Sequence, residues 1–393
     1  MKLSVSDLEV KGKKVLLRVD FNVPLSGRQV VDDTRIRAAL PTITDLLKRG
    51  ARLILVSHLG RPCGEVRPEL RLDPVAARLS ELLGRPVAKL DRVIGPQVAE
   101  AIKDLAGGEA LLLENVRFEK GEEANDPEFA RQLARLADLF VNDAFGTAHR
   151  AHASTAGVAE YIPAAAGLLM ARELEVLSRC LEQPARPLAA ILGGAKVSDK
   201  LKVLHRFLDL ADTLLIGGGM ANTFLAALRY PLGNSYFEQD SLEDAKNILE
   251  AAERSACCLQ LPVDLTVTRE LKPHSAFKVV PVGEVAKGWQ AVDIGPETAV
   301  FFSEVAAEAG TILWNGPLGV FETAPFHQGT ETVARAVAES KAFSIVGGGD
   351  IVAALEGFGL AGKIDFISTG GGATLKLWEG AVLPGIAVLQ NKK

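Results

Sequence analysis

Short apolar runs that end in polar residues alternate with helix-like segments in the first half of the chain. These runs occupy residues 13–22, 51–61, 110–118 and 138–146. Apolar positions recur at helical spacing over 34–50, and Gly50 ends that segment. A second helical pattern over 127–138 opens with Asp126 and Pro127. Strands that alternate with helices favour a parallel sheet covered by helices on both faces.

The second half repeats this order, but its strands end differently. Six apolar runs occupy residues 188–196, 213–221, 258–265, 311–319, 343–350 and 366–374. Four of the six end in two or three consecutive glycines, whereas the first-half runs end in charged or amide side chains. The predicted fold class is therefore α/β, with two doubly wound, Rossmann-like parallel-sheet domains.

A helix over residues 168–187 is expected to connect the two domains, which span 1–167 and 188–376. One apolar face of this helix consists of Met170, Leu174, Leu177 and Leu181. A length of 393 residues fits two domains better than one or three. The connecting helix could act as a hinge or as a static strut, and the sequence favours neither.

The polar residues at the ends of the first-half strands are candidate ligand-binding groups. In open parallel sheets, ligands bind beyond the carboxyl ends of the strands. The residues expected there are Asp20, Asn22, His58, Arg61 and Arg117, with Arg150 in the loop after the last strand. Arg18 alternates with Asp20 and Asn22 in the stretch RVDFNVP. For Arg18 we expect a structural ion pair rather than direct contact with a ligand.

The glycine-rich strand ends of the second half indicate a nucleotide phosphate chain. Glycine lets backbone amides approach an anion at the start of the following helix. A single glycine triplet could simply form a tight turn, but four such ends in one sheet favour phosphate binding. The stretch GGAKVSDK lacks the P-loop order, and no triplet completes GxGxxG.

Composition and charge narrow the possible functions. The formal net charge is −5, which excludes an overall basic field for nucleic acid. The N-terminal stretch lacks a signal-peptide or transit pattern and no apolar run is long enough to cross a membrane, so we expect a cytoplasmic protein. The cysteines at 63, 180, 257 and 258 form no CxxC pair and are expected to be reduced, mostly packing residues. His149 and His152 are weak evidence for a metal site, because no acidic partner accompanies them.

Nine dispersed motifs resemble those of the phosphoglycerate kinases, in the same order and over essentially the whole chain. The motifs are RVDFNVP, SHLGRP, ENVRF, FVNDAFGTAHRAHAS, GGAKVSDK, GGGMA, WNGPLGVFE, GGGD and STGGGATL. The resemblance implies a monomeric, two-domain hinge enzyme. Its reaction would be reversible, magnesium-dependent phosphoryl transfer between 1,3-bisphosphoglycerate and ADP, giving 3-phosphoglycerate and ATP. The last residues, 377–393, would return to the N-terminal domain.

The resemblance also implies roles for individual residues. Arg61, Arg117, Arg150 and His58 would bind the 3-phosphate of the glycerate, and Asp20 and Asn22 its hydroxyl and carboxyl region. Arg35 would meet the transferring phosphoryl group, although by itself the sequence favours a surface charge on a helix there. Lys196 would approach the same group from the other domain.

The nucleotide site implied by the resemblance lies in the second half. Lys200 would contact the phosphates and Asp350 would hold Mg²⁺, although Asp350 could also be a simple helix cap. Asn315 and Glu322 would belong to the ribose and triphosphate region, with Pro317 and Val320 lining it. The remaining members of this site would be Gly194, Ala195, Gly218, Gly348, Gly349 and Ile351, with a phosphate loop of Ser368, Thr369, Gly370 and Gly371.

Three residues depart from the family pattern, all in the nucleotide half. Ile351 replaces a hydroxyl residue, Ala291 a glycine near the adenine, and Asn222 an aromatic residue. None of these departures removes a charge that the chemistry needs. Transfer to a carboxylate needs no general base, because the accepting oxygen is already anionic. Two rivals stay open: a kinase with a hydroxyl acceptor and Asp20 as base, and a nucleotide sensor without catalysis.

Overall fold

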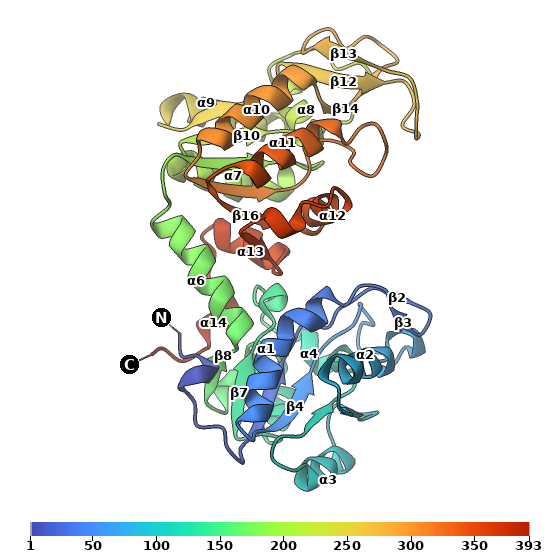
Figure 1. The fold of residues 1–393 in the computed structure, drawn as a ribbon, viewed down its shortest axis with the longest axis vertical. Coiled ribbons are helices and arrows are strands. Elements are labelled where there is room, and N and C mark those ends of the chain that lie inside the picture. Colours follow the sequence, from blue (N-terminus) through green and yellow to red (C-terminus); the bar gives the residue numbers. More distant parts are fainter. Residues whose placement is uncertain (1, 393) are drawn as a thin grey trace. The chain divides into compact units, whose positions relative to one another are not determined.

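The computed structural model describes residues 2–392, and these residues form two compact units. The first contains the chain up to Val176 and again from Val382 onward, and the second is Leu177–Ala381. Each unit has its own six-stranded parallel sheet and its own hydrophobic core (Figure 1). The predicted fold class, two doubly wound parallel-sheet domains, is confirmed.

The sheet of the first unit has the strand order β5-β6-β4-β1-β7-β8. Its strands are β1 (Lys14–Arg18), β4 (Arg52–Val56), β5 (Ala88–Lys89), β6 (Ala110–Leu112), β7 (Leu139–Asn142) and β8 (Ala164–Ala166). A small hairpin consists of β2 (Leu25–Ser26) and β3 (Gln29–Val30). Arg18 pairs with Val56 on one side and with Asn142 on the other, so three strands end at the same level.

The first strand ends earlier than its sequence pattern predicts. The expected run 13–22 ends as a strand at Arg18, and Asp20 and Asn22 follow in irregular backbone. The short strands β5 and β8 were not predicted. β8 consists of three alanines, which are poor strand formers, and it is held by its place beside β7.

The helices of the first unit largely follow the predicted apolar periodicity. They are α1 (Thr34–Lys48), α2 (Asp73–Leu83), α3 (Pro96–Asp104), α4 (Lys120–Glu123), α5 (Pro127–Ala134) and α14 (Pro384–Ala387). The predicted start of α5 is confirmed, because the Asp126 side chain accepts a hydrogen bond from the amide of Phe129. That helix ends at Ala134, four residues before the predicted end.

The two ends of the chain lie side by side within the first unit (Figure 1). The backbone amide of Leu3 donates to the carbonyl oxygen of Gln390 over 2.7 Å. Nδ2 of Asn142, at the end of β7, donates to the carbonyl oxygen of Gly385 in α14 over 3.1 Å. The C-terminal segment is therefore bonded to the edge of the sheet where β7 ends.

In the second unit, the main sheet has the order β11-β10-β9-β15-β16-β17, and all six strands begin within the predicted runs. They are β9 (Leu188–Leu192), β10 (Thr213–Ile216), β11 (Cys258–Gln260), β15 (Thr311–Asn315), β16 (Phe343–Gly347) and β17 (Phe366–Ser368). The run 258–265 is not one strand, because irregular backbone over residues 261–263 separates β11 from β12 (Asp264–Thr268). β12 lies in a second, antiparallel sheet between β13 (Phe277–Pro281) and β14 (Gln290–Ile294), which the sequence analysis missed.

The helices of the second unit follow its strands. They are α7 (Leu201–Leu210), α8 (Gly218–Ala227), α9 (Leu242–Arg254), α10 (Pro296–Glu308), α11 (Gln328–Glu339), α12 (Gly349–Gly357) and α13 (Gly372–Trp378). Three of them, α8, α12 and α13, begin within glycine-rich strand ends.

Helix α6 (Leu168–Glu182) carries the chain from the first unit into the second. It begins where the sequence predicts and ends five residues before the predicted Pro187. The earlier end has a local cause, because Pro184 disfavours the helical conformation of the residue before it. No helix within residues 2–392 is long and apolar enough to cross a membrane.

All four cysteines are free. Cys180 and Cys257 are buried, whereas Cys63 and Cys258 are exposed. The prediction of mostly packing cysteines therefore fits only two of the four.

Candidate active site

Three strand ends of the first unit are joined around Gly60. Nη1 of Arg35 lies 3.2 Å from Oδ2 of Asp20 and donates to the carbonyl oxygen of Asn22 over 3.1 Å. Oδ1 of Asn22 accepts from the amide of Gly60 over 2.9 Å, and Nη1 of Arg117 donates to the carbonyl oxygen of Gly60 over 2.7 Å. The structure thus brings the residues after β1, β4 and β6 together with the first turn of α1.

Arg18 lies beneath this cluster and is wholly buried. Its Nε donates to Oγ of Ser154 over 2.8 Å, and its Nη2 lies 3.2 Å from Nδ1 of His58. Oγ of Ser154 donates to Oε1 of Glu122, also wholly buried, over 2.7 Å. Arg18 therefore has a structural place, but it reaches its acidic partner through Ser154 instead of forming the direct ion pair that we expected.

Two histidines of this region, His58 and His152, are neutral at pH 7. Burial, together with the charges of Arg18, Arg117, Arg35 and Arg150, holds the pKa of His58 well below its ordinary value. Burial and neighbouring arginines lower the pKa of His152 to about 4. The positive charge at these strand ends therefore comes from arginines.

Two arginines of the predicted set are free to bind an anion. Among residues 2–392, the guanidinium groups of Arg61 and Arg150 make no hydrogen bond or ion pair. Arg61 directly follows Gly60. Arg150 is near enough to Arg117 for its positive charge to lower the pKa of Arg117. Arg117 itself is buried and balanced by Glu123, with 3.2 Å between its Nε and Oε1 of the glutamate.

In the second unit, three strand ends approach so closely that only glycine fits. A Cβ atom on Gly193 would lie 2.0 Å from the carbonyl oxygen of Pro317. Gly218 has a φ of +66°, and a Cβ there would lie 2.8 Å from the carbonyl oxygen of Gly194. The loops after β9, β10 and β15 are thereby held against one another.

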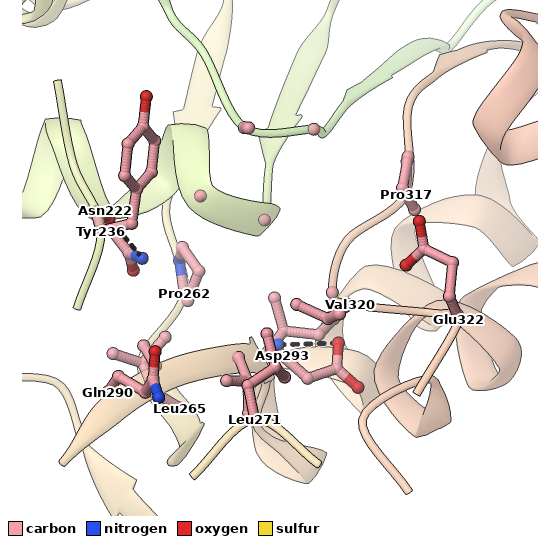
Figure 2. Close-up of a pocket in the computed structure, with 18 of the residues that line it drawn as sticks. Asn222, Tyr236, Pro262, Leu265, Leu271, Gln290, Asp293, Pro317, Val320 and Glu322 are labelled. Atoms are coloured by element: carbon pink, nitrogen blue, oxygen red, sulfur yellow. Dashed lines mark hydrogen bonds between the residues drawn. The ribbon is translucent and has the colours of Figure 1, made fainter. Parts of the chain in front are cut away.

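A cavity of about 320 Å³ opens beside these glycines (Figure 2). Figure 2 shows Asn222, Tyr236 and Pro262 on one side and Pro317, Val320 and Glu322 on the other. The cavity has the size of a small-molecule site and a largely apolar lining with a few polar groups. The predicted residues in its lining are Gly194, Ala195, Gly218, Pro317, Val320, Glu322 and Asp350, together with Asn222 and Ala291.

Lys200 lies beside the glycine turns. Its Nζ donates to the carbonyl oxygens of Gly193 and Asn315. Burial lowers the pKa of Lys200 to about 8, while the charge of Asp350 opposes the shift. Lys200 is therefore still charged at pH 7. Asp350 is exposed in the first turn of α12, and Lys196 is exposed in the loop after β9.

The other predicted nucleotide residues do not line this cavity. Asn315 Nδ2 donates to the carbonyl oxygen of Gly347, and Ser368 Oγ lies 2.5 Å from Thr374 Oγ1, so both side chains support glycine turns. Ile351 is wholly buried in the hydrophobic core, which explains how an apolar side chain is accommodated there. The predicted residues outside the lining are Lys196, Lys200, Asn315, Gly348, Gly349, Ile351, Ser368, Thr369, Gly370 and Gly371.

Several lining residues were not found by sequence reasoning. They are Gly219, Tyr236, Pro262, Leu265, Leu271, Gln290, Val292, Asp293, Ile294 and Gly319. Most belong to the second sheet or to loops around it, and no local pattern marks them. Asp293 is a possible exception, because an acid within the apolar stretch AVDIG is unusual. It is buried, its pKa is raised well above the ordinary value by that burial, and it accepts from the amides of Ile294 and Gly329.

An arginine cluster at the strand ends of one unit and a cavity of about 320 Å³ beside glycine turns in a second unit are features of a two-domain α/β phosphotransferase. The family model described as phosphoglycerate kinase matches residues 5–381. The chain belongs to the phosphoglycerate kinase family. Members of this family move a phosphoryl group reversibly between 1,3-bisphosphoglycerate and ADP, giving 3-phosphoglycerate and ATP in glycolysis, and this chain is such an enzyme.

Curated relatives and solved structures agree with this assignment. The chain is 56% identical over 391 residues to a phosphoglycerate kinase of Moorella thermoacetica, covering 100% of both chains. It is 56% identical over 393 residues to that of Rubrobacter xylanophilus, covering 100% of this chain and 99% of the relative. The structure of phosphoglycerate kinase from Coxiella burnetii matches with a TM-score of 0.91 and 45% identity, over 99% of this chain and 98% of that one. The enzyme from Pyrococcus horikoshii matches with a TM-score of 0.86 and 35% identity, over 98% of each chain.

Proposed function

We propose that the arginine cluster of the first unit binds the glycerate substrate. The observation that carries this proposal is the pair of unpaired guanidinium groups, Arg61 and Arg150, beside the balanced Arg117. Guanidinium groups pair bidentately with phosphate and stay charged at every physiological pH, which suits the non-transferring 3-phosphate. Neutral His58 would donate or accept one further hydrogen bond there, depending on its tautomer. Asp20 and Asn22 would hold the hydroxyl and carboxyl region of the glycerate.

The cavity of the second unit would hold ATP or ADP. Its apolar side, with Pro262, Leu265 and Ala291, suits a flat base. Glu322 on the opposite side would accept from ribose hydroxyls. The phosphates would extend toward Lys200 and the starts of α8 and α12, where free backbone amides and the helix dipoles favour negative charge.

The residues around Asp350 fit a magnesium ion bound together with nucleotide phosphates. Mg²⁺ keeps several waters and usually takes only one or two protein carboxylates in phosphate-transfer sites. Asp350 is exposed and lines the cavity, whereas no group of three or more His, Cys, Asp or Glu within residues 2–392 could hold a metal alone. When bound, the ion would neutralise phosphate charge. Asp350 would hold it and would also stabilise the charged form of Lys200.

The transfer itself would depend on positive charge and on position. Arg35 from the first unit and Lys196 from the second would surround the migrating phosphoryl group, whose negative charge spreads over its equatorial oxygens. Reacting atoms must come within about 3 to 3.5 Å. Because the two substrates would bind to separate units, in-line transfer would need an arrangement of the units that brings the two substrates to this distance, which a hinge movement would supply.

A coupled spectrophotometric assay tests the assignment of substrates and metal. Purified protein is given 3-phosphoglycerate, ATP and Mg²⁺, and each component is omitted in turn. Turnover should require all three, and EDTA should abolish it until Mg²⁺ is restored in excess. Undiminished turnover without added metal in the presence of EDTA would exclude the magnesium role of Asp350.

We also propose that the chain works as a cytoplasmic monomer that does not bind nucleic acid. The formal net charge of −5 supports the last point, because phosphate backbones are bound through positive fields. Light scattering after size exclusion should give the chain mass of 41.8 kDa. Twice that mass would disprove the monomer.

A further inference from the structure

The side chain of Glu238 is bonded to the loop that carries Lys196. Its Oε1 accepts from Oγ of Ser198 over 2.6 Å, and its Oε2 accepts from the amide of Ser198 over 3.0 Å. Glu238 also accepts a hydrogen bond from the amide of Val197. Donors from two successive residues of the loop after β9 therefore converge on one carboxylate, although 40 residues separate Glu238 from Ser198.

The charge of Glu238 acts on the same loop. Partial burial raises the pKa of Glu238, but the hydrogen bonds from Ser198 and Val197 and the positive charge of Lys196 outweigh burial and hold the pKa below its ordinary value. The carboxylate is therefore ionised at pH 7. Lys196 itself is exposed, and its ammonium group makes no hydrogen bond or ion pair within residues 2–392. The loop is thus held while the end of the lysine side chain stays available.

Glu238 is held in turn by helix α8. Its backbone amide donates over 3.1 Å to Oγ1 of Thr223, which is wholly buried. Nδ2 of Asn222, on the same helix, donates to the carbonyl oxygen of Tyr236 over 3.1 Å. The segment 236–238 is thereby bonded at two points to a helix whose first turn lines the nucleotide cavity.

The segment that carries Glu238 also belongs to the wall of this cavity. Tyr236, two residues before Glu238, lines the cavity beside Asn222 (Figure 2). Ala195, directly before Lys196, lines it as well. The carboxylate of Glu238 therefore joins two segments that a bound nucleotide would touch, and it fixes one of them relative to the other.

A loop that presents a charge to a reacting group has to be held precisely, because a displacement of about 1 Å can lower a rate a hundredfold. Packing of the wholly buried Val197 anchors the loop, whereas the hydrogen bonds of Glu238 are directional and fix its orientation. We propose that Glu238 is a positioning residue that fixes Lys196 relative to the nucleotide cavity and so supports phosphoryl transfer without contacting either substrate. This inference rests on the proposed role of Lys196.

The test measures kcat in four proteins, which are the wild type, Glu238→Ala, Lys196→Ala and the double variant. Glu238→Ala should lower kcat about ten- to a hundredfold in the wild-type background. In the Lys196→Ala background the same change should alter kcat by less than about twofold, because the group that Glu238 positions is already gone. A merely structural role would lower kcat by the same factor in both backgrounds, since a loss of folded protein does not depend on Lys196.

Two further variants serve as controls. In Glu238→Gln the side-chain oxygen can still accept from the Ser198 amide, so kcat should stay within about threefold of wild type. Glu243 is exposed in the first turn of α9. Glu243→Ala, which removes a glutamate of the same unit, should leave kcat unchanged.

The outcomes separate this inference from the proposed function. Wild-type kcat in Glu238→Ala, or an equal loss in both backgrounds, would overturn the inference while the role of Lys196 stands. A loss in Glu238→Gln as large as that in Glu238→Ala would also overturn it, because the hydrogen bonds would then not be what positions the loop. Wild-type kcat in Lys196→Ala would instead refute the proposed role of Lys196, and this inference with it.

If Glu238→Ala does not fold, Ser198→Ala decides in its place. This change removes one donor to Glu238 at an exposed position. It should lower kcat about threefold, as the loss of one hydrogen bond would give. Wild-type kcat in Ser198→Ala would then overturn the inference.

Discussion

Nε of Arg18 lies 2.8 Å from Oγ of Ser154, although 136 residues separate the two along the chain. Ser154 is in turn hydrogen-bonded to Glu122, since its hydroxyl donates to Oε1 of Glu122 and its amide donates to Oε2. On the other side, Arg18 contacts Nδ1 of His58. A buried cation and a buried anion are thereby linked by one small side chain beneath the proposed glycerate site.

We expect Ser154→Ala to destabilise the first unit. The change leaves one donor of Arg18 and one acceptor of Glu122 buried without a partner, which costs about 2 to 3 kcal/mol of the free energy of unfolding. Urea unfolding followed by far-UV circular dichroism measures this loss. Ser6→Ala, at an exposed position of the same unit, is the control and should change stability by less than about 0.5 kcal/mol. Similar values for the two variants would show that the Ser154 bridge is not needed.

Arg35→Ala should lower kcat far more than it weakens the binding of either substrate. In the structure this arginine contacts Asp20 and Asn22 through one nitrogen only, and its side chain is 40% exposed. Loss of one donor to transition-state charge costs about a hundredfold in kcat. Lys196→Ala should behave in the same way. Arg37→Ala, two positions along α1 and paired with Asp33, is the control and should turn over at close to the wild-type rate. Wild-type kcat in Arg35→Ala would refute its role.

Arg61→Ala should weaken the binding of 3-phosphoglycerate and leave the binding of ADP unchanged. A charge-assisted hydrogen bond contributes about 1.5 to 3 kcal/mol, so the dissociation constant for the glycerate should rise about ten- to a hundredfold. Calorimetric titration with each ligand separately measures both effects. Arg67→Ala removes an exposed arginine from the same loop and should affect neither ligand. A weaker affinity for ADP in Arg61→Ala would contradict the assignment of the glycerate to the first unit.

Asp143→Asn should change how stability depends on pH. Burial raises the pKa of Asp143 to about 6, against hydrogen bonds from the Thr42 side chain and from the amides of Met170, at 3.1 Å, and Leu169. The folded protein therefore holds this proton more tightly than the unfolded chain does. The stabilisation that comes from binding this proton is complete below about pH 4 and is lost as the pH rises through 6. Relative to wild type, the variant should gain about 2 kcal/mol between pH 4.5 and 7.5.

Denaturant titrations of both proteins at several pH values test this expectation. Only the difference between them is informative, because other groups add slopes of their own. His152, whose pKa is lowered to about 4, makes the native state more stable as the pH rises over the same range. A difference between wild type and variant that does not vary with pH would show that Asp143 is ionised throughout.

Local sequence patterns were sufficient to predict the elements that depend on neighbouring residues or that form short apolar strands. All six main-sheet strands of the second unit begin within predicted runs, because each is a short apolar segment followed by glycine or a polar residue. The start of α5 at Asp126 and Pro127 was equally readable, since a cap is made by neighbours in the chain. By contrast, β8 and the sheet formed by β12, β13 and β14 carry weak local signals: β8 consists of three alanines, and four of the five residues of β13 are exposed.

In the candidate site, too, some residues could be predicted from the sequence and others could not. Polar residues that follow buried strands, such as Asp20, His58 and Arg117, stand out in the sequence because water or a ligand must accompany them. The lining of the second-unit cavity does not stand out, because Tyr236, Leu271 and Gln290 are ordinary residues that become neighbours only in the folded unit.

The sequence by itself determined the two α/β domains, the arginine-rich and glycine-rich strand ends, and the family resemblance that the comparisons confirm. These properties follow from periodicity and residue chemistry, which need no knowledge of distant contacts. Only the tertiary structure decided that Arg18 reaches Glu122 through Ser154, that Ile351 belongs to the core, and that Glu238 is bonded to Ser198. Such facts depend on which atoms meet between segments that are distant in the sequence, and the geometry of packing sets those meetings.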